Sequence, residues 1–315
     1  MEQLGPMDIE HAAEILRAGG LVAFPTETVY GLGASAFDGR AVAKIYEAKG
    51  RPSFNPLILH VASLDQAQAL AALSETALKL VDAFWPGPMT LVCPNPAPEI
   101  SKLTTAGLDS VALRMPDLKL ARDLIAATGV PLAAPSANRS GKISPTRADH
   151  VITDLAGRID AVLDGGPTTV GLESTILDTT GDRITCLRPG GLALEEVSTL
   201  LGYEVEIAKP SNPESPSSPG QLRSHYAPKV AVRLNADNAT ETELLLGFGT
   251  SAEADLNLSQ DADLEEAAAN LFAHLHDLDR LAHQIGKTGI AVSPIPEMGL
   301  GLAINDRLRR AAAPR

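Results

Sequence analysis

Charged and polar side chains gather in a few short segments of this 315-residue sequence, most of them punctuated by glycine or proline. In residues 49–57, Lys49 and Arg51 stand two residues apart beside prolines, and Asn55 follows. Arginine offers a planar fork of donors to phosphate oxygens, and lysine offers a compact charge. A solvated charged turn would explain the same residues, so this segment alone indicates an anion site without establishing one.

Five other segments carry similar residues. Residues 25–33 supply hydroxyls, although a capped helix start would also explain them. In residues 110–116, Arg114 interrupts an apolar strand, where an unpaired cation costs several kcal/mol. Arg114 therefore needs either an internal Asp or Glu or the carboxylate of a ligand. Residues 134–146 carry hydroxyls together with cations. Residues 164–175 contain glycine turns that expose backbone N–H groups, and residues 187–191 place a cation at a strand end.

Familiar catalytic and nucleotide-binding motifs are absent from the sequence. It has no GxxxxGK[ST] loop, no GxGxxG after Gly31, no GxSxG and no HExxH. Cys93 and Cys186 lie singly in apolar stretches, which predicts reduced core residues and excludes a disulfide framework. His274 and His276 are two apart on a predicted helix and are expected to be solvated. No nucleophile has a paired base, which favours a reaction whose substrates supply the nucleophile.

The elements that must position these segments alternate between helices and strands, which predicts an α/β fold. Several strands follow one another with no helix between them, so we expect a mixed sheet. Polar segments at strand ends suit ligand binding in open sheets of this class. We predict helices over residues 8–18, 40–48, 64–84 (one or two), 118–128 and 194–201, and strands over 21–24, 57–61, 89–93, 111–115, 130–134, 159–163, 174–177 and 183–187.

A linker divides the chain, because nine of the twelve residues 209–220 are Pro, Ser or Gly. We predict a large domain over residues 1–206, a linker over 207–229 and a small α/β domain over 230–315. The small domain is expected to hold strands over 230–234, 243–248 and 289–293 and helices over 264–285 and 301–312.

The net charge of −13 and the 3% aromatic content weigh against a nucleic-acid-binding role. The N-terminus lacks a secretory pattern, and no window is long and apolar enough to span a bilayer. We therefore expect a cytoplasmic protein with no membrane contact.

Eight ordered motifs together resemble the YrdC-like threonylcarbamoyl-AMP synthases, in their long two-domain branch. The motifs are PTETVYGLG, KGRP with NPL, WPGPMTLV, VALRMP, APSANRSGKISPT, GLESTILD, LRPGG and, after the linker, SHYAP. The resemblance implies an open mixed sheet with flanking helices and a smaller Rossmann-like C-terminal domain.

The same resemblance implies a nucleotidyl transfer. L-threonine, bicarbonate or carbon dioxide, and ATP with Mg²⁺ become L-threonylcarbamoyl-AMP and pyrophosphate. Other proteins then transfer the threonylcarbamoyl group to the adenosine beside the anticodon of tRNA.

The family pattern assigns roles to individual residues of this sequence. The KxR…SxN signature is complete, and its catalytic residues would be Lys49, Arg51, Ser136 and Asn138. ATP would meet Arg51, Asn55, Ser110, Ser136, Ser144, Arg188, His225 and Tyr226, and threonine would meet Thr28, His60, Arg114, Ala134 and Ser174. The resemblance assigns no metal ligands.

The linker would act as a lid, with His225 and Tyr226 folded back over the nucleotide. Residues 221–224 depart from the family, because many relatives carry a methionine and another aromatic residue there.

Two rival hypotheses remain. Domains of this type have been linked to double-stranded RNA, so an RNA-binding module with a cationic crevice is one, weakened by the acidity and the scarcity of rings. Carbamoyl transfer in hydrogenase maturation is the other. That setting normally adds Cys-rich zinc modules, which two cysteines cannot make.

Overall fold

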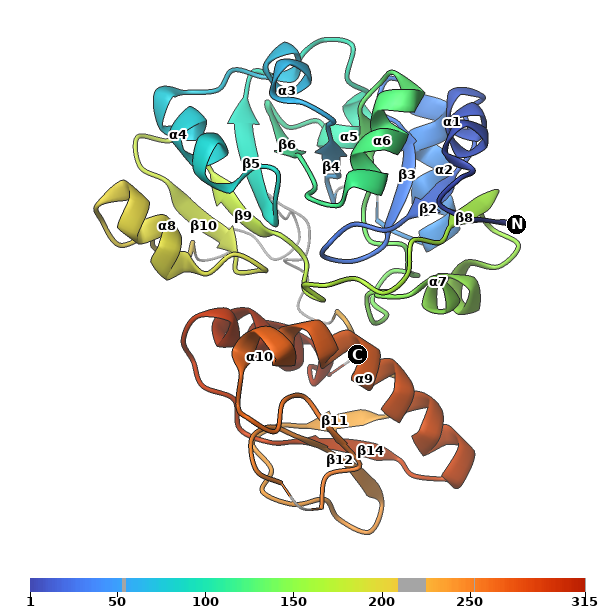
Figure 1. Ribbon diagram of the computed structural model, residues 1–315, viewed down its shortest axis with the longest axis vertical. Helices are drawn as coiled ribbons and strands as arrows, with labels where there is room; N and C mark the ends of the chain where they lie inside the picture. Colours follow the sequence, from blue (N-terminus) through green and yellow to red (C-terminus); the bar gives the residue numbers. More distant parts are fainter. Residues whose placement is uncertain (53–54, 209–224, 252, 315) are drawn as a thin grey trace.

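The computed structural model describes residues 1–52, 55–208, 225–251 and 253–314, which form a larger and a smaller α/β part (Figure 1). The larger part contains β1 (Glu2–Leu4), α1 (Ile9–Arg17), β2 (Val22–Phe24), β3 (Gly31–Ser35), α2 (Gly39–Lys49), β4 (Ile58–His60), α3 (Leu64–Leu70), α4 (Glu75–Phe84), β5 (Met89–Pro94), α5 (Lys102–Thr105), β6 (Ser110–Arg114), α6 (Lys119–Thr128), β7 (Leu132–Ala133), α7 (Ala148–Leu155), β8 (Ala161–Leu163), β9 (Thr175–Asp178), β10 (Thr185–Arg188) and α8 (Leu194–Leu201). The smaller part contains β11 (Ala231–Arg233), β12 (Glu243–Gly247), β13 (Leu256–Asn257), α9 (Leu264–Ile285), β14 (Gly289–Val292) and α10 (Leu300–Ala311).

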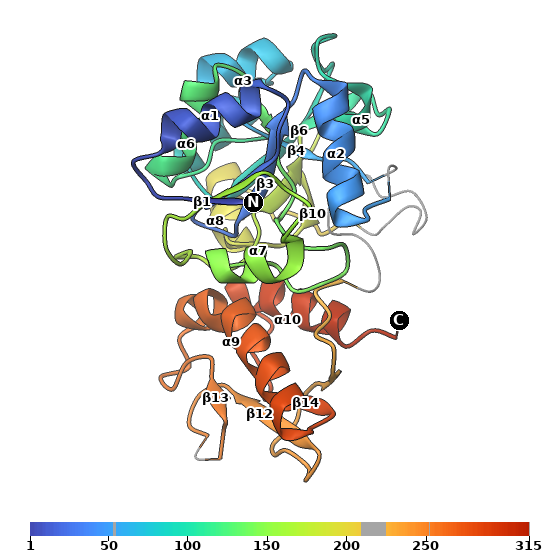
Figure 2. The same cartoon turned by 90° about the vertical axis from the view of Figure 1, so that its right-hand side faces the viewer.

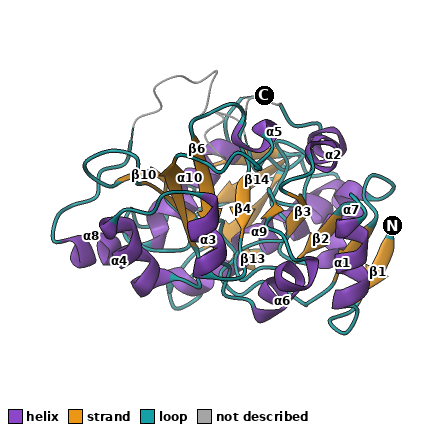
Figure 3. Cartoon of the chain, turned by 90° about the horizontal axis from the view of Figure 1, so that it is seen from above, coloured by secondary structure: helices purple, strands orange, loops and turns teal. Residues whose placement is uncertain are grey.

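The larger sheet is mixed, as predicted, with ten described strands in the order β1-β8-β2-β3-β7-β4-β6-β5-β9-β10. Its central strands β3 and β7 pair antiparallel, as do β4 and β7, whereas β4 and β6 are parallel. Helices flank the strands when the molecule is seen from above (Figure 3). Neighbouring residues of β2 belong to opposite cores: Val22 and Phe24 pack with α1 and α6, whereas Ala23 packs with the core that includes α2. This alternation is what a strand buried on both faces requires.

The sequence prediction missed the strand at residues 31–33, which it assigned to a polar segment following the strand at 21–24. They begin β3, which pairs antiparallel with β2. Gly33 permits this pairing because a Cβ there would lie 2.9 Å from Cε1 of Phe24. The ring of Phe24 therefore fills the space over a glycine-containing strand, and the glycines serve packing.

Short elements with weak patterns were also missed, namely β1, α5, α7 and β13. Residues 64–84, which were predicted to form one or two helices, form two, α3 and α4. The second, α4, begins where Ser74 Oγ accepts a hydrogen bond from the Ala77 N–H at 3.1 Å. This side-chain cap marks the start of α4, which the apolar pattern of residues 64–84 does not locate.

The smaller sheet is entirely parallel, with the strand order β11-β14-β12-β13 and helices α9 and α10. Both views place α9 and α10 between this sheet and the larger part (Figures 1 and 2). The small core continues into the larger part, because Val29, Ile143 and Leu172 pack in the same cluster as Phe272. Within the described residues, no helix is long and apolar enough to cross a membrane.

Candidate active site

A polar cavity lies against β4 in the middle of the larger sheet. Ile58 and His60, two residues apart on β4, both contribute to its wall and therefore share one face of the strand. The full lining is Thr26, Val29, Gly31, Arg51, Ile58, His60, Arg114, Ala134, Pro135, Ser136, Glu173, Ser174, Arg188, His225 and Tyr226. Segments that are far apart in the sequence thus converge on one cavity.

The predicted KxR…SxN residues form one connected group beside this cavity. Lys49 ends α2, is buried, and donates from Nζ to the carbonyl oxygens of Ser136 and Asn138 at 2.5 Å each. Ser136 Oγ donates to Asn138 Oδ1 at 2.5 Å. Burial, together with the charge of Arg51, holds the pKa of Lys49 well below its usual range. Lys49 and Asn138 do not line the cavity; they hold the loop that carries Ser136 into its wall.

Arg51 points its guanidinium at two backbone carbonyl groups of the following segment. Its Nη2 donates to the Pro56 oxygen at 2.9 Å and its Nε to the Asn55 oxygen at 3.3 Å. Burial lowers the pKa of Arg51 to about 10. Asn55 is buried behind the cavity wall, and its Oδ1 has no hydrogen-bond partner among the described residues. Arg51 is therefore held in one orientation at the cavity.

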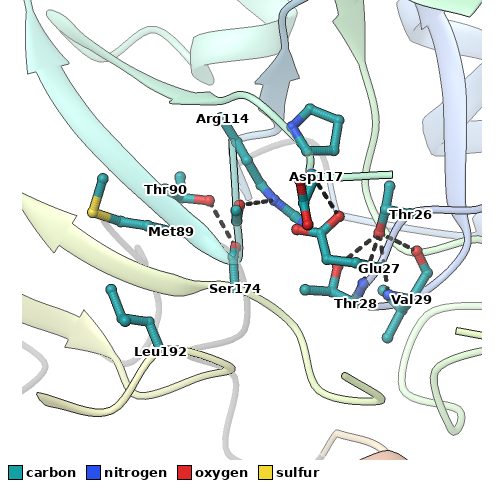
Figure 4. Close-up of polar contacts among 12 residues, drawn as sticks. Thr26, Glu27, Thr28, Val29, Met89, Thr90, Arg114, Asp117, Ser174 and Leu192 are labelled. Carbon is teal, nitrogen blue, oxygen red and sulfur yellow. Dashed lines mark hydrogen bonds and ion pairs between the residues drawn. The ribbon is translucent and has the colours of Figure 1, made fainter. Parts of the chain in front are cut away.

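Arg114, the cation inside strand β6, has an interior acid (Figure 4). Its Nη2 lies 2.6 Å from Glu27 Oε1, and both side chains are buried. The other Glu27 oxygen accepts the Asp117 N–H at 3.0 Å. Of the two alternatives left open by the sequence, the internal acid is present, so this buried cation by itself does not require a ligand. The observation that still favours a ligand contact is the position of Arg114 in the cavity wall.

Thr28, which the resemblance placed near threonine, is buried and lies outside the cavity lining. Its Oγ1 is 2.7 Å from Thr26 Oγ1, which donates to the Val29 carbonyl oxygen (Figure 4). Thr26, two residues earlier in the same motif, supplies a hydroxyl-bearing side chain of the wall. The sequence reasoning singled out the motif and missed this member of it.

The other residues predicted to meet threonine do line the cavity. His60 is buried, its Nδ1 has no partner among the described residues, and burial together with the charge of Arg114 lowers its pKa to about 3. Ser174 Oγ lies 2.7 Å from Thr90 Oγ1 (Figure 4). Ala134 completes this side. The imidazole of His60 is thus neutral at ordinary pH.

On the predicted nucleotide side, Arg188 lines the cavity, whereas Asn55, Ser110 and Ser144 do not. Arg188 Nη2 donates to the Ser174 carbonyl oxygen at 2.8 Å. Ser110 begins β6, and Ser144 is buried behind the wall. The prediction that Asn55, Ser110 and Ser144 meet the nucleotide stays a prediction, and none of the three lies in the cavity lining.

Glu173, which the sequence reasoning did not assign, is a buried carboxylate in the wall. Its Oε1 accepts from Ser144 Oγ at 2.5 Å, and its Oε2 from Arg307 Nε at 2.8 Å. Burial opposes its ionisation, but the charges of Arg307 and Arg188 and the Ser144 hydrogen bond bring its pKa below the usual range. The residue stands in the quoted motif GLESTILD, and an acid beside a predicted substrate serine could have indicated it.

His225 and Tyr226 cover the cavity from the C-terminal side of the linker. Their ring centroids are 4.0 Å apart, and Tyr226 also stacks on Phe272 of α9 at 5.4 Å. The Ala227 N–H donates to the Gly141 carbonyl oxygen at 3.0 Å. Residues 209–224 of the predicted lid, including the departure from the family pattern at 221–224, lie outside the described residues. Ser53 and Phe54 of the segment 49–57 also lie outside them.

The cysteines agree with the sequence prediction, whereas the two histidines predicted to be solvated are both half-buried. Cys93 and Cys186 are free, buried thiols. His276 is not a solvated residue: it stacks on His150 of α7 at 3.9 Å, and its Nε2 lies 3.2 Å from the Ser144 carbonyl oxygen. The contact between the two parts of the molecule partly buries His276, which a helical pattern alone could not reveal.

Within the part of the chain that the structure describes, no group of three or more His, Cys, Asp or Glu side chains could hold a metal ion. The two carboxylates of the cavity region, Glu27 and Glu173, are engaged by Arg114 and Arg307. These residues do not fit a protein-held Mg²⁺, which prefers free carboxylate oxygens.

The cavity of this α/β fold brings together three arginines, several hydroxyls and two histidines, an arrangement typical of a small-molecule binding site. The family model described as "Telomere recombination" (Sua5, YciO and YrdC) matches residues 14–190. The model of the threonylcarbamoyl-AMP synthase C-terminal domain matches residues 192–313. The chain therefore belongs to the Sua5/YrdC family, in its two-domain threonylcarbamoyl-AMP synthase branch.

Individual relatives agree over almost the whole chain. The threonylcarbamoyl-AMP synthase of Bacillus subtilis (strain 168) is 43% identical over 98% of this chain and 93% of its own length. That of Pyrococcus abyssi (strain GE5 / Orsay) is 43% identical over 100% and 96%, respectively. The crystal structure of P. abyssi Sua5 complexed with L-threonine matches with a TM-score of 0.90 and 41% identity, covering 99% of this chain and 97% of that one. The recognition made from the eight motifs is confirmed.

A more distant neighbour shows only the fold. The crystal structure of E. coli YciO is 21% identical, covers 60% of this chain and 94% of that chain, and has a TM-score of 0.55.

Proposed function

We propose that this enzyme is a nucleotidyltransferase that makes L-threonylcarbamoyl-AMP and pyrophosphate from L-threonine, bicarbonate or carbon dioxide, and ATP. The observation that carries the proposal is the convergence of Arg51, Arg188 and Ser136 with Arg114 and His60 on one covered cavity. The P. abyssi relative with L-threonine bound supports the choice of amino acid.

The proposed reaction leaves most of the bond-making to the substrates. The threonine amine captures carbon dioxide as a carbamate, losing a proton. A carbamate oxygen then attacks the α-phosphorus of ATP, and pyrophosphate leaves with the electron pair of the broken P–O bond. Catalysis of this kind depends on positioning and on charge neutralisation.

The chain's own residues supply these two effects. Arg51 and Arg188 would meet the phosphates, and both are already oriented by backbone carbonyl oxygens, so little reorganisation is needed at the moment of reaction. Lys49 and Asn138 hold the Ser136 loop. Arg114 would meet the threonine carboxylate while Glu27 fixes its guanidinium. The described residues offer no fitting metal site, and in this proposal Mg²⁺ arrives as part of the ATP substrate.

The linker over residues 207–229 would act as the lid of this site, between domains at 1–206 and 230–315. His225 and Tyr226 lie over the cavity and would exclude water from a hydrolysable product. We further propose that the product serves the threonylcarbamoyl modification of tRNA beside the anticodon, through separate transferase proteins in the cytoplasm. RNA contact by this chain itself stays the weaker hypothesis.

Mass spectrometry of products tests the proposed function directly. The purified protein, incubated with ATP, threonine, bicarbonate and Mg²⁺, should form threonylcarbamoyl-AMP and pyrophosphate with no RNA present. Omission of threonine should abolish both products, and serine in its place should give less. Pyrophosphate release that does not depend on threonine, or AMP formation only with added RNA, would contradict the proposal.

A further inference from the structure

Arg307 of helix α10 carries a positive charge from the small C-terminal part into the interior of the molecule. Its side chain is fully buried and heads the largest fully buried side chains of the described residues. Its Nε donates to Glu173 Oε2 at 2.8 Å, and its Nη1 donates to the Pro189 carbonyl oxygen at 2.9 Å and to Asp306 at 2.8 Å. Two of these three partners belong to the larger part of the molecule.

These partners belong to the nucleotide side of the cavity. Glu173 is in the cavity wall and accepts from Ser144 through its other oxygen. Pro189 directly follows Arg188, which is also in the wall. The guanidinium carbon of Arg307 is 5.3 Å from the ring centroid of Tyr226, within the range of a cation–π contact. Arg307 thus contacts Glu173 and Tyr226, and through Pro189 it lies next to Arg188.

A buried carboxylate needs a counter-charge, because an uncompensated one is strongly destabilising or takes up a proton. Arg307 gives Glu173 that counter-charge. The Glu173 oxygens are then engaged by Arg307 and Ser144, while Arg188 keeps its hydrogen bonds to Ser174.

Another ion pair joins the two parts without approaching the cavity. Arg147, at the start of α7, lies 3.2 Å from Asp277 of α9, and both side chains are about one-third exposed (34% and 28%). Neither residue lines the cavity. The domains therefore have an attachment that leaves the site untouched, whereas every contact of Arg307 outside its own helix falls at the site.

We propose that Arg307 is a positioning residue for the nucleotide side of the cavity, so that the C-terminal domain completes the active site by neutralising Glu173 and holding Tyr226. This inference rests on the proposed function and gives the C-terminal domain a role in it. Arg307 does not touch the reacting atoms; it acts through Glu173, Ser144 and Tyr226.

The experiment compares Arg307→Gln and Arg307→Lys with the matched control Arg309→Gln in the full chain. Arg309 stands on the same helix in an exposed ion pair with Glu297, so its loss removes one cation without touching the site. Steady-state assays give KM for ATP and for threonine, ATP calorimetry gives the Kd, and thermal unfolding reports the folded state of each variant.

We expect Arg307→Gln to raise KM and Kd for ATP about tenfold, the loss typical of one well-placed charged contact, and to change KM for threonine less than about twofold. Arg307→Lys should recover part of the loss, since it keeps the charge but not the planar fork. Adding Glu173→Gln to Arg307→Gln should also recover part of the ATP affinity, because the uncompensated carboxylate is gone. Arg309→Gln should match the wild type.

Equal increases of KM for both substrates, or unchanged ATP binding in folded Arg307→Gln, would overturn the inference. If Arg307→Gln does not fold, the ATP-to-threonine ratio of KM in Arg307→Lys decides. If the wild type forms no product, the proposed function fails, and ATP calorimetry on the same variants still tests Arg307.

Discussion

At the scale of single residues, the cavity gathers cations that the protein has already oriented. Arg51 is held by the carbonyl oxygens of Asn55 and Pro56, Arg188 by that of Ser174, and Arg114 by Glu27. Fixed donors of this kind stabilise developing negative charge without having to reorient during the reaction. This arrangement makes the proposed binding of a polyanion compatible with the net charge of −13.

Arg51→Ala and Arg114→Ala should therefore impair the enzyme in different ways. Loss of Arg51 should raise KM for ATP at least tenfold and leave KM for threonine nearly unchanged, because its guanidinium is proposed to meet phosphate. Loss of Arg114 should chiefly raise KM for threonine. Exposed Arg158 provides the control, Arg158→Ala. Steady-state kinetics with each substrate varied in turn would measure both, and equal effects on the two substrates would refute the assignment.

Arg114→Ala should also destabilise the fold, because it leaves Glu27 buried without a counter-charge. Breaking one partner of a buried pair costs about 3–5 kcal/mol. The double variant Arg114→Ala with Glu27→Gln should regain much of that stability and none of the threonine affinity. Urea unfolding measures the first quantity and kinetics the second, so a stability loss can be separated from a substrate contact.

At the scale of elements, the loop between β8 and β9 sets how closely α9 approaches the larger part. Gly171 adopts a positive φ of 72°, and a Cβ there would lie 2.4 Å from the Ala268 carbonyl oxygen of α9. Gly166 in the same loop also has a positive φ, 83°, but a Cβ there would meet nothing within 4 Å. A comparison of the alanine variants at these two glycines therefore distinguishes backbone strain from a steric clash with α9.

Gly171→Ala should destabilise the protein more than Gly166→Ala. The Gly166 variant carries only the left-handed backbone cost of about 1–2 kcal/mol, whereas the Gly171 variant must in addition displace α9. Because α9 carries Phe272, on which Tyr226 stacks, Gly171→Ala should also lower activity. Thermal unfolding and product formation test this, and equal losses of stability in the two variants would show that α9 does not pack as described.

At the scale of the whole molecule, neutral buried histidines make stability depend on pH. Burial lowers the pKa of His60, His150 and His225 to about 3, with nearby charges of Arg114, His276 and Arg51 adding to the effect. The unfolded chain binds protons at these sites below its ordinary histidine pKa of about 6.5. Because the pKa of each histidine is lower in the folded than in the unfolded state, its contribution to the free energy of unfolding is complete above pH 6.5. That contribution is lost as the pH falls toward 3.

Urea unfolding between pH 7.5 and pH 4.5 should show this loss. Each of these histidines contributes a slope approaching 1.4 kcal/mol per pH unit below pH 6, about 4 kcal/mol per unit for the three together. His150→Gln should reduce the slope by about one third. His11 is the control, because its exposed side chain has a pKa that its hydrogen bond to Glu2 raises. His11→Gln therefore cannot reduce the loss of unfolding free energy at acidic pH. A pH-independent free energy of unfolding would contradict the buried, neutral histidines.

Local patterns were sufficient for most of the fold. Apolar periodicity and glycine stops predicted the long helices, α9 at Leu264–Ile285 among them, and the mixed character of the sheet. They failed for β3, where Gly31 and Gly33 suggested a loop because nothing local shows that the Phe24 ring covers them. They failed for α7, whose polar sequence forms a helix that packs on α9 through His150 and His276.

The sequence by itself determined the residue types of the site and the family, because eight motifs in order are a property of the chain alone. Only the tertiary structure decided which side chains form the cavity wall. It placed Thr26 in the cavity wall and Thr28 outside it, gave Arg114 an interior acid, and brought Arg307 from the C-terminal part of the sequence to Glu173. The physical reason is that pairing of buried charges and closure of a cavity depend on distances between segments remote in sequence, which no local pattern encodes.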